Sequence, residues 1–376
     1  MKILIISDQY LPSTRSSSIL IHDLIQGLIK KGNKVTLITS TQNKNGRNSI
    51  NKHLEIIRVK IFPFKNKSFI NKGLNQIFLL LQIIFNIIFL NKKFDKVFIY
   101  CPPLFLGLIN IFFKKKKKII NVQDFFPQNA IDLGILKNKI LIFIIRKIEK
   151  VVYDYSDFIL VNSLNSKKYL ANKFPQIKKR IIFNYNWIKL NKIKKNNYKG
   201  KKFRFIFGGS LGPSQDLKKV FNVFKNLSQK CELHIYGNGI SKEDLQNEIK
   251  LNDIKNIKIF DPLPNSKFKE RLQEYDSALL TLNSDNRTPF IPGKFNFYCS
   301  QKKNTTAIVH KKCDLNYIIK NEKLGFVSSQ NNTKKLIPFF KRIISSKNIK
   351  KLDANALNYA KKNFDVKYIV NKLEKI

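Results

Sequence analysis

The chain has 376 residues, of which 43% are hydrophobic, and its 71 Lys and Arg against 25 Asp and Glu give a formal net charge of +46. This length and apolar content predict two folded domains with substantial cores and exclude a disordered tail protein. The charge suits phosphate-bearing ligands or anionic lipid. However, the lysines are spread along the chain and no nucleic-acid motif accompanies them, so we expect no nucleic-acid partner. Cys101, Cys231, Cys299 and Cys313 form no CxxC pair, which argues against zinc or redox motifs and favours reduced thiols.

The N-terminal half alternates short apolar runs with helical periodicity. Residues 3–6 are expected to form a first strand rather than a signal peptide, 19–30 a helix, and 35–38 a second strand. This strand–helix–strand beginning predicts a parallel sheet. The further strands expected in this half are 54–59, 96–100, 118–122, 158–161 and 180–183.

Residues 74–90 form an uncharged, strongly apolar helical segment. It is short for a membrane span and is interrupted by Asn and Gln. Two interpretations stay open: a buried helix that covers the sheet, or a helix lying at a membrane surface. The second is favoured by basic residues around this segment, namely Lys65, Lys67, Lys72, Lys92, Lys93 and the run 114–118.

The polar, lysine-rich stretch 190–202 is the expected linker between domains covering 1–189 and 203–352. After it the alternation restarts, and two such halves predict two Rossmann-like domains with ligand crevices at the carboxyl ends of their strands. The tail 353–376 is expected to form one or two helices. The strands expected in the second half are 203–207, 232–236, 257–260, 278–282, 306–309 and 325–328, with helices at 217–227 and 242–251 between them.

The sequence DNRTPFIPGKFNFY, residues 285–298, follows an expected strand and precedes a helix that begins near Pro292. The N–H groups of a helix N-terminus favour anions, and Gly293 would let the backbone approach a ligand closely. Arg287 and Lys294 could add charge-assisted bonds to a diphosphate. The alternative is a surface loop in a lysine-rich protein.

Other candidates also lie at expected strand ends. Two glycine turns follow neighbouring strands, and each can cradle a phosphate or sugar or form a plain tight turn. Asp124 and Asp8 each close a strand, where a carboxylate can orient a sugar hydroxyl, transfer a proton or cap a helix. The histidines show no ligand spacing and are expected to be structural. The glycines are Gly208, Gly209, Gly212, Gly237 and Gly239.

The ordered set of these motifs resembles the retaining glycosyltransferases of family 4 across essentially the whole chain. The most similar branch includes fucosaminyl- and N-acetylhexosaminyltransferases of O-antigen and capsule synthesis. The motifs are MKILIISDQYLP, VQDFFPQNAIDLGIL, YNW, FGGSLGPSQDL, YGNG, TLNSDNRTPFIPGKFNFY and YAKKNFDVKYIVNKLEKI.

The resemblance implies an α/β GT-B fold of two Rossmann-like domains, the first binding the acceptor and the second the nucleotide-sugar. The segment 353–376 would pack back on the first domain, and no metal or other cofactor would be needed. Arg287 and Lys294 would hold the diphosphate and Asp124 would lie beside the reacting sugar, these three being the expected catalytic residues. The expected donor-binding residues are Gly208, Gly209, Ser210, Gly212, Gly237, Gly239, Pro292 and Gly293, and those on the acceptor side are Asp8, Ser17 and Ser18.

The chain departs from the family pattern at several positions. Ser210 and Gln215 replace two basic residues, which leaves more of the phosphate charge to Arg287 and Lys294. Phe297 stands where the family has a ribose-binding glutamate, and a phenyl ring accepts no hydrogen bond from ribose hydroxyls. Gln123 stands where relatives often have histidine, and the N-terminal glycine loop of the family is replaced by serines at 16–18.

We therefore expect a cytoplasmic enzyme, peripheral on the inner face of the cell membrane. It would move a sugar with retention from a nucleotide-sugar to a lipid-linked glycan in O-antigen or capsule synthesis, with an anionic membrane surface as a further partner. A sugar-nucleotide epimerase of the same architecture is a second possibility, although it would need cleft carboxylates and a histidine. A membrane-associated scaffold that has lost its chemistry is a third, favoured by the departures at Ser210, Gln215 and Phe297.

Overall fold

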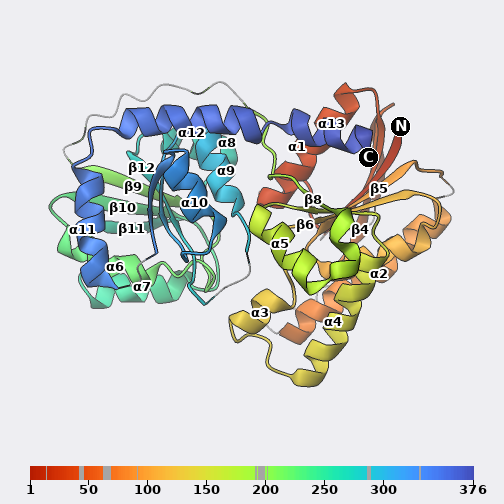
Figure 1. The fold of residues 1–376 in the computed structure, drawn as a ribbon, viewed down its shortest axis with the longest axis horizontal. Coiled ribbons are helices and arrows are strands. Elements are labelled where there is room, and N and C mark those ends of the chain that lie inside the picture. Colours follow the sequence, from red (N-terminus) through yellow and green to blue (C-terminus); the bar gives the residue numbers. More distant parts are fainter. Residues whose placement is uncertain are drawn as a thin grey trace. The chain divides into compact units, whose positions relative to one another are not determined.

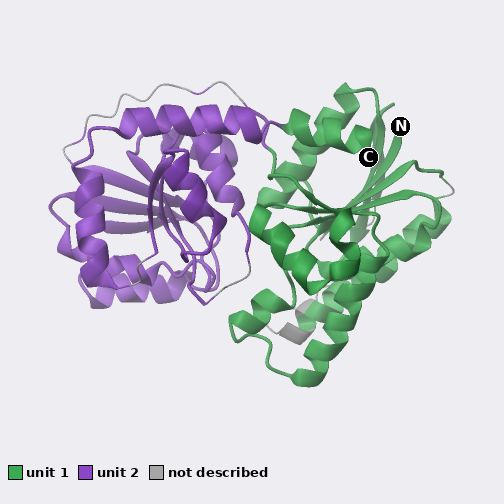
Figure 2. Cartoon of the chain, viewed as in Figure 1, with its two compact units in different colours: residues 1–187, 366–376 green, residues 188–365 purple. Residues whose placement is uncertain are grey.

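The structure is a computed structural model that describes residues 1–13, 15–41, 46–61, 69–90, 92–190, 193, 200, 202–285, 289–329 and 332–376. It divides into two compact units, which Figure 2 shows in different colours. Unit 1 comprises Met1–Trp187 and Val366–Ile376, and unit 2 comprises Ile188–Asp365.

Unit 1 is built on an eight-stranded sheet in the order β3-β4-β2-β1-β5-β6-β7-β8 (Figure 1). All neighbouring strands are parallel except β3 and β4, which are antiparallel. The strands are β1 (Lys2–Ser7), β2 (Lys34–Thr41), β3 (Gly46–Asn51), β4 (Leu54–Lys60), β5 (Lys96–Cys101), β6 (Lys117–Val122), β7 (Phe158–Val161) and β8 (Ile181–Phe183). The helices are α1 (Ser16–Lys30), α2 (Phe69–Phe89), α3 (Gln128–Asp132), α4 (Lys139–Asp154), α5 (Leu164–Lys173) and α13 (Val366–Lys375), with 3-10 helices η1 (Leu104–Phe112) and η2 (Pro175–Arg180).

The central strands of unit 1 are apolar at nearly every position because both faces of the sheet are covered, as is usual for parallel sheets. Within β1, Ile3 and Ile5 belong to the core under α1, and Leu4 and Ile6 to the core under α2 and α4. This period of two follows from the alternation of side chains along a strand. The positions expected as strands in this half lie in strands of one sheet, except Arg180, which ends η2 immediately before β8.

Unit 2 is built on a six-stranded, fully parallel sheet in the order β11-β10-β9-β12-β13-β14. The strands are β9 (Phe203–Gly208), β10 (Cys231–Tyr236), β11 (Ile257–Phe260), β12 (Ser277–Thr281), β13 (Thr305–Ile308) and β14 (Gly325–Ser328). The helices are α6 (Lys218–Asn226), α7 (Lys242–Leu251), α8 (Asn265–Leu272), α9 (Gly293–Ser300), α10 (Asp314–Asn321), α11 (Thr333–Ile344) and α12 (Ile349–Asn363).

Each sheet changes direction once. In unit 2 the chain moves from β9 outward to β11 and then returns to place β12 on the other side of β9. In unit 1 the corresponding change lies between β1 and β5. Ligands of open parallel sheets bind in the crevice outside the carboxyl ends of the strands at such a switch point. The topology therefore points to the ends of β9 and β12, and of β1 and β5, as the places to examine.

The expected C-terminal segment 353–376 divides between the two units. The tail does not pack as one piece on the first domain, because residues 353–363 belong to α12, which packs on α9 within unit 2. Asp353 accepts hydrogen bonds from the backbone N–H and side chain of Asn304, and Ala356 and Ala360 are buried. Only Val366–Ile376 belongs to unit 1, where Ile369, Val370 and Leu373 enter the core under α1. The expected linker 190–202 lies mostly outside the described residues.

Candidate active site

The carboxyl end of β9 is followed by a loop that lies directly against the loop after β10. Gly209 and Leu211 donate backbone hydrogen bonds of 2.9 Å to the carbonyls of Tyr236 and Asn238. A Cβ atom on Gly237 would lie 2.1 Å from the carbonyl oxygen of Gly209. A Cβ atom on Gly239, whose φ is +155°, would lie equally close to that of Leu211. These glycines are therefore required for the contact between the two loops, whatever ligand the loops hold.

Lys294, the second residue of α9, runs beside this loop. Its Cε atom would lie 2.7 Å from a Cβ on Gly209, which has a φ of +126°, so only glycine leaves room for the lysine stem. Its Nζ atom is buried 3.7 Å from the centre of the Phe207 ring and has no hydrogen-bond partner among the described residues. Burial lowers the pKa of Lys294 to about 7. A buried ammonium without a hydrogen-bonded partner is costly, and buried charges in proteins are normally paired or bound to a ligand.

The N-terminus of α9, the helix that carries Lys294, provides further donors. Pro292 is the N-cap residue and makes no side-chain cap, so the N–H groups of the first turn are not satisfied by the cap side chain. A Cβ on Gly293 would meet nothing within 4 Å. The helix end, the open side of Gly293 and the ammonium of Lys294 together form a strong candidate for an anion site.

The remaining donor-side residues have clear positions. Gly208 donates a 3.0 Å hydrogen bond to the hydroxyl of Tyr298, and its Cα packs under the Phe268 ring, which a Cβ would approach to 2.2 Å. Ser210 is exposed at the tip of the loop. Gly212 donates its N–H to the side chain of Gln215 at 3.2 Å, so Gln215 stabilises the loop internally. Arg287 lies outside the described residues.

Aromatic side chains line the other side of this loop, and the sequence analysis did not identify them as a group. Phe268 of α8 and Phe297 of α9 are stacked with their ring centroids 5.9 Å apart. Phe268 also makes an edge contact with Tyr236 at 6.0 Å. Phe297, at the position of the expected ribose contact, is thus part of an aromatic cluster beside Gly208. The one sequence signal for the cluster was the phenylalanine in place of glutamate.

In unit 1, Asp124 follows β6. The residue is partly exposed, but its Oδ1 atom is buried and has no hydrogen-bond partner in the described part of the chain. Burial raises the pKa of Asp124 to about 6. A carboxyl group with a pKa near neutrality and a free oxygen is suited to proton transfer or to binding a hydroxyl group.

An amide cluster that the sequence analysis missed lies at the same sheet edge. Gln123 donates to Asn121 Oδ1 at 2.9 Å and accepts from Asn186 Nδ2 at 2.6 Å. Asn162, which follows β7, lies 3.5 Å from the same Gln123 oxygen. These four amides come from the ends of β6, β7 and β8, which is the arrangement expected where a sugar is bound by several hydrogen bonds. The available signal was the position of each amide at or just after a strand end.

Asp8, Ser17 and Ser18 lie at the switch point between β1 and β5. Burial raises the pKa of Asp8, partly offset by Arg15, and its backbone carbonyl accepts a hydrogen bond from Ser40. Ser17 and Ser18 are in the first turn of α1, where Ser18 Oγ is buried without a partner among the described atoms. Asp8 and Asp124 end strands separated only by β5, so both belong to one edge of the sheet.

We found no group of three or more His, Cys, Asp and Glu side chains arranged to hold a metal ion, within the part of the chain that the structure describes. The candidate anion-binding groups in unit 2 are a lysine and a helix end. These observations define a class of protein: two Rossmann-like domains with parallel sheets, one with an anion site and the other with a polar edge suited to hydroxyl groups.

Comparison with known proteins gives this class a fold name. No family model matches the sequence. The chain is 21% identical over 288 residues to the probable glycosyltransferase WbjE of Pseudomonas aeruginosa, a match covering 72% of each chain. Among solved structures it is similar to sucrose-phosphate synthase from Thermosynechococcus elongatus, with a TM-score of 0.81 at 10% identity, covering 100% of this chain and 97% of the other.

Two further structures are similar over nearly their whole length. Anabaena HepE in complex with UDP and glucose matches with a TM-score of 0.72 at 13% identity, covering 100% of this chain and 98% of HepE. WaaG, a glycosyltransferase involved in lipopolysaccharide biosynthesis, matches with a TM-score of 0.67 at 12% identity, covering 99% and 98%. At these identities the likeness shows the fold, which is GT-B.

Proposed function

We propose that this chain is a glycosyltransferase that uses a nucleotide-sugar as donor. The observation that carries the proposal is the buried, unpartnered ammonium of Lys294 beside Gly209 and the N-terminus of α9, at the switch point of unit 2. A diphosphate would supply the missing negative charge. Support comes from WbjE, named as a probable glycosyltransferase, and from HepE, whose structure holds UDP and glucose.

The proposed reaction is transfer with retention, as in the family 4 enzymes that the motifs resemble. The bond between the anomeric carbon and the diphosphate oxygen breaks, and the acceptor hydroxyl forms the new bond on the same face of the sugar. The acceptor proton passes to the departing phosphate oxygen, so no separate protein base is required. Lys294, the N–H groups of α9 and Arg287 would stabilise the negative charge that develops on the diphosphate.

The acceptor would bind unit 1. Asp124 and the amide cluster around Gln123 offer a carboxylate and several amide donors and acceptors, which suit the hydroxyl groups of a glycan. We propose a lipid-linked glycan of surface polysaccharide synthesis, O-antigen or capsule, with the protein peripheral on the cytoplasmic side of the membrane. WaaG, which shares the fold, is named as a lipopolysaccharide enzyme, and the motif resemblance is to the fucosaminyl- and N-acetylhexosaminyltransferase branch.

The test is transfer of radiolabelled sugar from a panel of nucleotide-sugars to a lipid extract that contains polyprenyl-diphosphate glycans. Label in the lipid fraction, dependent on the protein and strongly reduced in Lys294→Met, is the expected result. Conversion of the donor into an isomer without any acceptor would instead identify an epimerase. Donor binding without release of nucleotide under any acceptor condition would identify a non-catalytic scaffold.

A further inference from the structure

One face of unit 1 exposes an unusual amount of apolar side chain. Along α2, large apolar residues repeat at the spacing of one helix face, and Phe85 and Ile88 are 62% and 65% exposed. Exposed apolar residues continue on the start of α4, where Ile140 is 73% exposed. We call this set the apolar face; its members are Leu74, Ile77, Leu81, Phe85, Ile88, Phe89, Phe112, Ile135, Ile140, Phe143 and Ile144.

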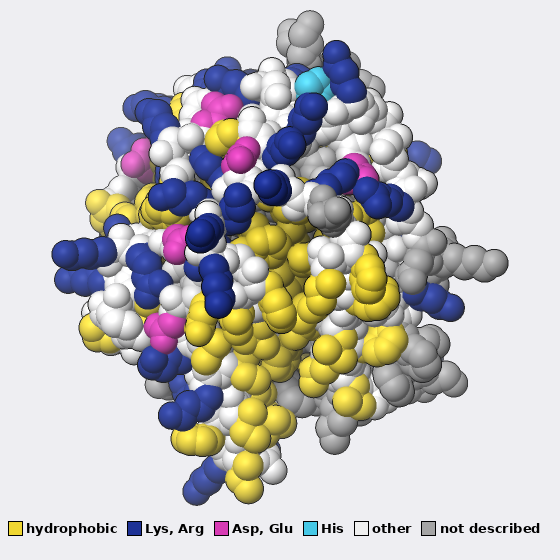
Figure 3. Space-filling view, turned by 90° about the vertical axis from the view of Figure 1, so that its right-hand side faces the viewer, with side chains coloured by type: hydrophobic (Ala, Val, Ile, Leu, Met, Phe, Trp, Pro, Cys, Tyr) yellow, Lys and Arg dark blue, Asp and Glu magenta, His cyan; other side chains and the backbone are white. Residues whose placement is uncertain are grey.

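The face is continuous because η1 packs against both helices. Leu79, Leu80 and Ile83 on the opposite side of α2 enter the core that also contains η1 residues. A Cβ on Gly107 of η1 would lie 2.3 Å from Val152 of α4, so these two elements are in close contact. Figure 3 shows hydrophobic side chains gathered in one band over the middle and lower part of this face. Contiguous exposed apolar patches of this kind mark interaction sites.

Basic residues surround the band. Lys92 and Lys93 follow α2, Lys114 and Lys115 follow η1, and all four are exposed. Within α4, the Nζ atom of Lys147 lies 5.3 Å from the centre of the Phe143 ring. In Figure 3, Lys and Arg side chains border the upper and left margins of the band, with a smaller number of acidic side chains among them.

The combination of an apolar band and a basic border indicates which partner binds the apolar face. A second copy of the chain would bring two lysine-rimmed faces together in a protein whose formal net charge is already +46, which opposes self-association. An anionic lipid bilayer satisfies both parts of the surface, because the apolar side chains enter the acyl boundary and the lysines meet lipid phosphates. None of the described helices is long and apolar enough to cross a bilayer.

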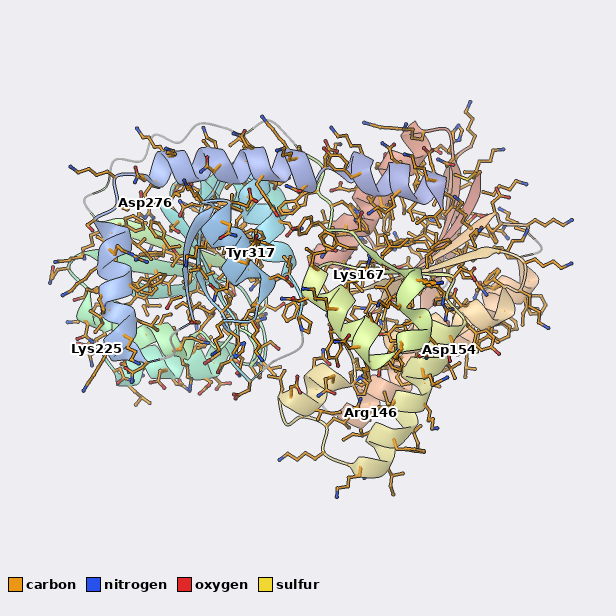
Figure 4. The ribbon with its side chains drawn as sticks, in the orientation of Figure 1. Arg146, Asp154, Lys167, Lys225, Asp276 and Tyr317 are labelled. Atoms are coloured by element: carbon orange, nitrogen blue, oxygen red, sulfur yellow. The ribbon has the colours of Figure 1, made fainter. Side chains whose placement is uncertain are left out.

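We propose that the apolar face of α2, η1 and α4 inserts into an anionic membrane surface and anchors unit 1 there. The polar side of α4 connects this anchor to the acceptor edge. Arg146 of α4, labelled in Figure 4, donates a 2.8 Å hydrogen bond to Gln128, which begins α3, four residues after Asp124. If the proposed function holds, this arrangement brings the acceptor edge close to the bilayer that carries a lipid-linked glycan.

The binding part of the inference is tested without any glycosyl transfer. The full chain is sedimented with vesicles of phosphatidylcholine alone and of phosphatidylcholine mixed with phosphatidylglycerol, at low and high salt. Wild type is expected to bind the anionic vesicles, and more weakly at high salt because the charges are screened. Phe85→Ser with Ile88→Ser is expected to lower the vesicle partition coefficient by about tenfold or more.

The matched control is Ile240→Ser with Leu251→Ser, which removes two apolar side chains that are 83% and 84% exposed in unit 2. For charge, Lys114→Gln with Lys115→Gln is expected to weaken binding to anionic vesicles only. The adjacent exposed pair Lys361→Gln with Lys362→Gln on α12 is expected to have less effect. Stabilisation by a nucleotide-sugar should be unchanged in every variant, which separates membrane binding from donor binding.

Three results would overturn the inference. The first is failure of wild type to bind anionic vesicles. The second is binding of the α2 variant that is as strong as binding of its unit 2 control. The third is a dimer in sedimentation velocity without lipid that the α2 variant dissociates, which would assign the apolar face to a second copy of the chain.

Discussion

The Nζ atom of Lys294 lies 3.7 Å from the centre of the Phe207 ring, and no hydrogen-bond partner for it exists among the described residues. Contact with an aromatic face recovers part of the lost hydration of an ammonium, but not its hydrogen bonds. The buried ammonium of Lys294 therefore destabilises the unliganded fold. A diphosphate bound beside it would make the burial of this charge favourable. Binding sites commonly retain residues that lower stability in this way.

The first prediction concerns Lys294→Met. It keeps the stem beside Gly209 and removes the charge. We expect the free energy of unfolding without ligand to rise by about 1–3 kcal/mol at pH 7, because an unpartnered buried polar group is removed. Donor binding should fall at least about tenfold, since the charge-assisted bonds to phosphate are lost. Urea unfolding and calorimetric titration measure the two effects; a variant both less stable and equally able to bind would contradict this account of the site.

The second prediction concerns how the stability of wild type and of Lys294→Met depends on pH. The pKa of Lys294 is lowered to about 7 in the folded state, so between there and its ordinary value of 10.5 the unfolded chain binds more protons. The stability of wild type should therefore rise, relative to Lys294→Met, as pH increases from about 7 to 10. Urea midpoints for both proteins at several pH values measure this. A difference that stays constant with pH would show that Lys294 keeps an ordinary pKa.

The third prediction concerns Asp124→Asn, for which the change of stability with pH has the opposite sign. Burial raises the pKa of Asp124 to about 6, above the ordinary value of 3.8. Ionisation of this carboxyl group therefore destabilises the folded state, and the cost disappears at low pH, where the group is protonated. The stability of wild type should fall relative to Asp124→Asn as pH rises from about 4 to 6. Transfer activity at pH 7.5 should fall about 100-fold in the variant if the carboxylate orients the acceptor hydroxyl for attack. Retained activity would reduce Asp124 to a structural residue.

The fourth prediction compares the stability and donor affinity of two glycine substitutions. Gly237→Ala would place a methyl group 2.1 Å from the Gly209 carbonyl, so it should destabilise unit 2 by about 2 kcal/mol or more. Gly293→Ala meets nothing within 4 Å and should leave stability within about 0.5 kcal/mol of wild type. Donor affinity in Gly293→Ala should nevertheless fall, if ligand occupies that open side. Thermal unfolding with and without nucleotide-sugar distinguishes these effects, and full donor affinity in a stable Gly293→Ala protein would place the ligand elsewhere.

A buried ion pair supplies the fifth prediction. Glu149 is fully buried on α4, and Lys173 Nζ lies 2.8 Å from its Oε2. Glu149→Ala leaves that ammonium without its partner and should cost about 3–5 kcal/mol of unfolding free energy. The control is Asp154→Ala on the same helix, whose partner Lys150 is largely exposed, and it should cost less than about 1 kcal/mol. Similar losses in the two variants would show that burial does not set the strength of the Glu149 pair.

The sequence predicted the parallel strands well because their apolar runs, buried on both faces, differ sharply from the polar loops. It missed β3 (Gly46–Asn51), which is antiparallel to β4 and largely exposed. Its residues are polar apart from Gly46 and Ile50, so no hydrophobic pattern marks the strand. For 74–90, α2 buries one side and exposes the other, so the interpretation as a buried helix is right for one side only, and the membrane-surface interpretation stays a prediction. The sequence of 74–90 indicates a helix, but it cannot show which side of the helix packs on the core when nearly every position is apolar.

The candidate site was predicted unevenly. The sequence placed Lys294 at a helix start, yet burial of its ammonium beside Gly209 depends on contacts between residues 85 positions apart. The amide cluster around Gln123 and the Phe268–Phe297 stack join several strand or helix ends, and only the tertiary structure brings those ends together. The expectation that 353–376 packs on the first domain was right only for Val366–Ile376. An amphipathic helix can pack on either unit, and the hydrogen bonds from Asn304 to Asp353 hold the start of this segment in unit 2.

The most direct test of the central claim is ligand-induced thermal stabilisation of wild type and Lys294→Met. UDP-, GDP- and dTDP-sugars and the free nucleotides form the panel, because a ligand that binds the native state raises its apparent stability by mass action. The account predicts that at least one nucleotide-sugar raises the Tm of wild type and that this rise is lost in Lys294→Met. No stabilisation of wild type across the panel, or an equal rise in both proteins, would contradict the claim that Lys294 is the diphosphate-binding group of a sugar-nucleotide site.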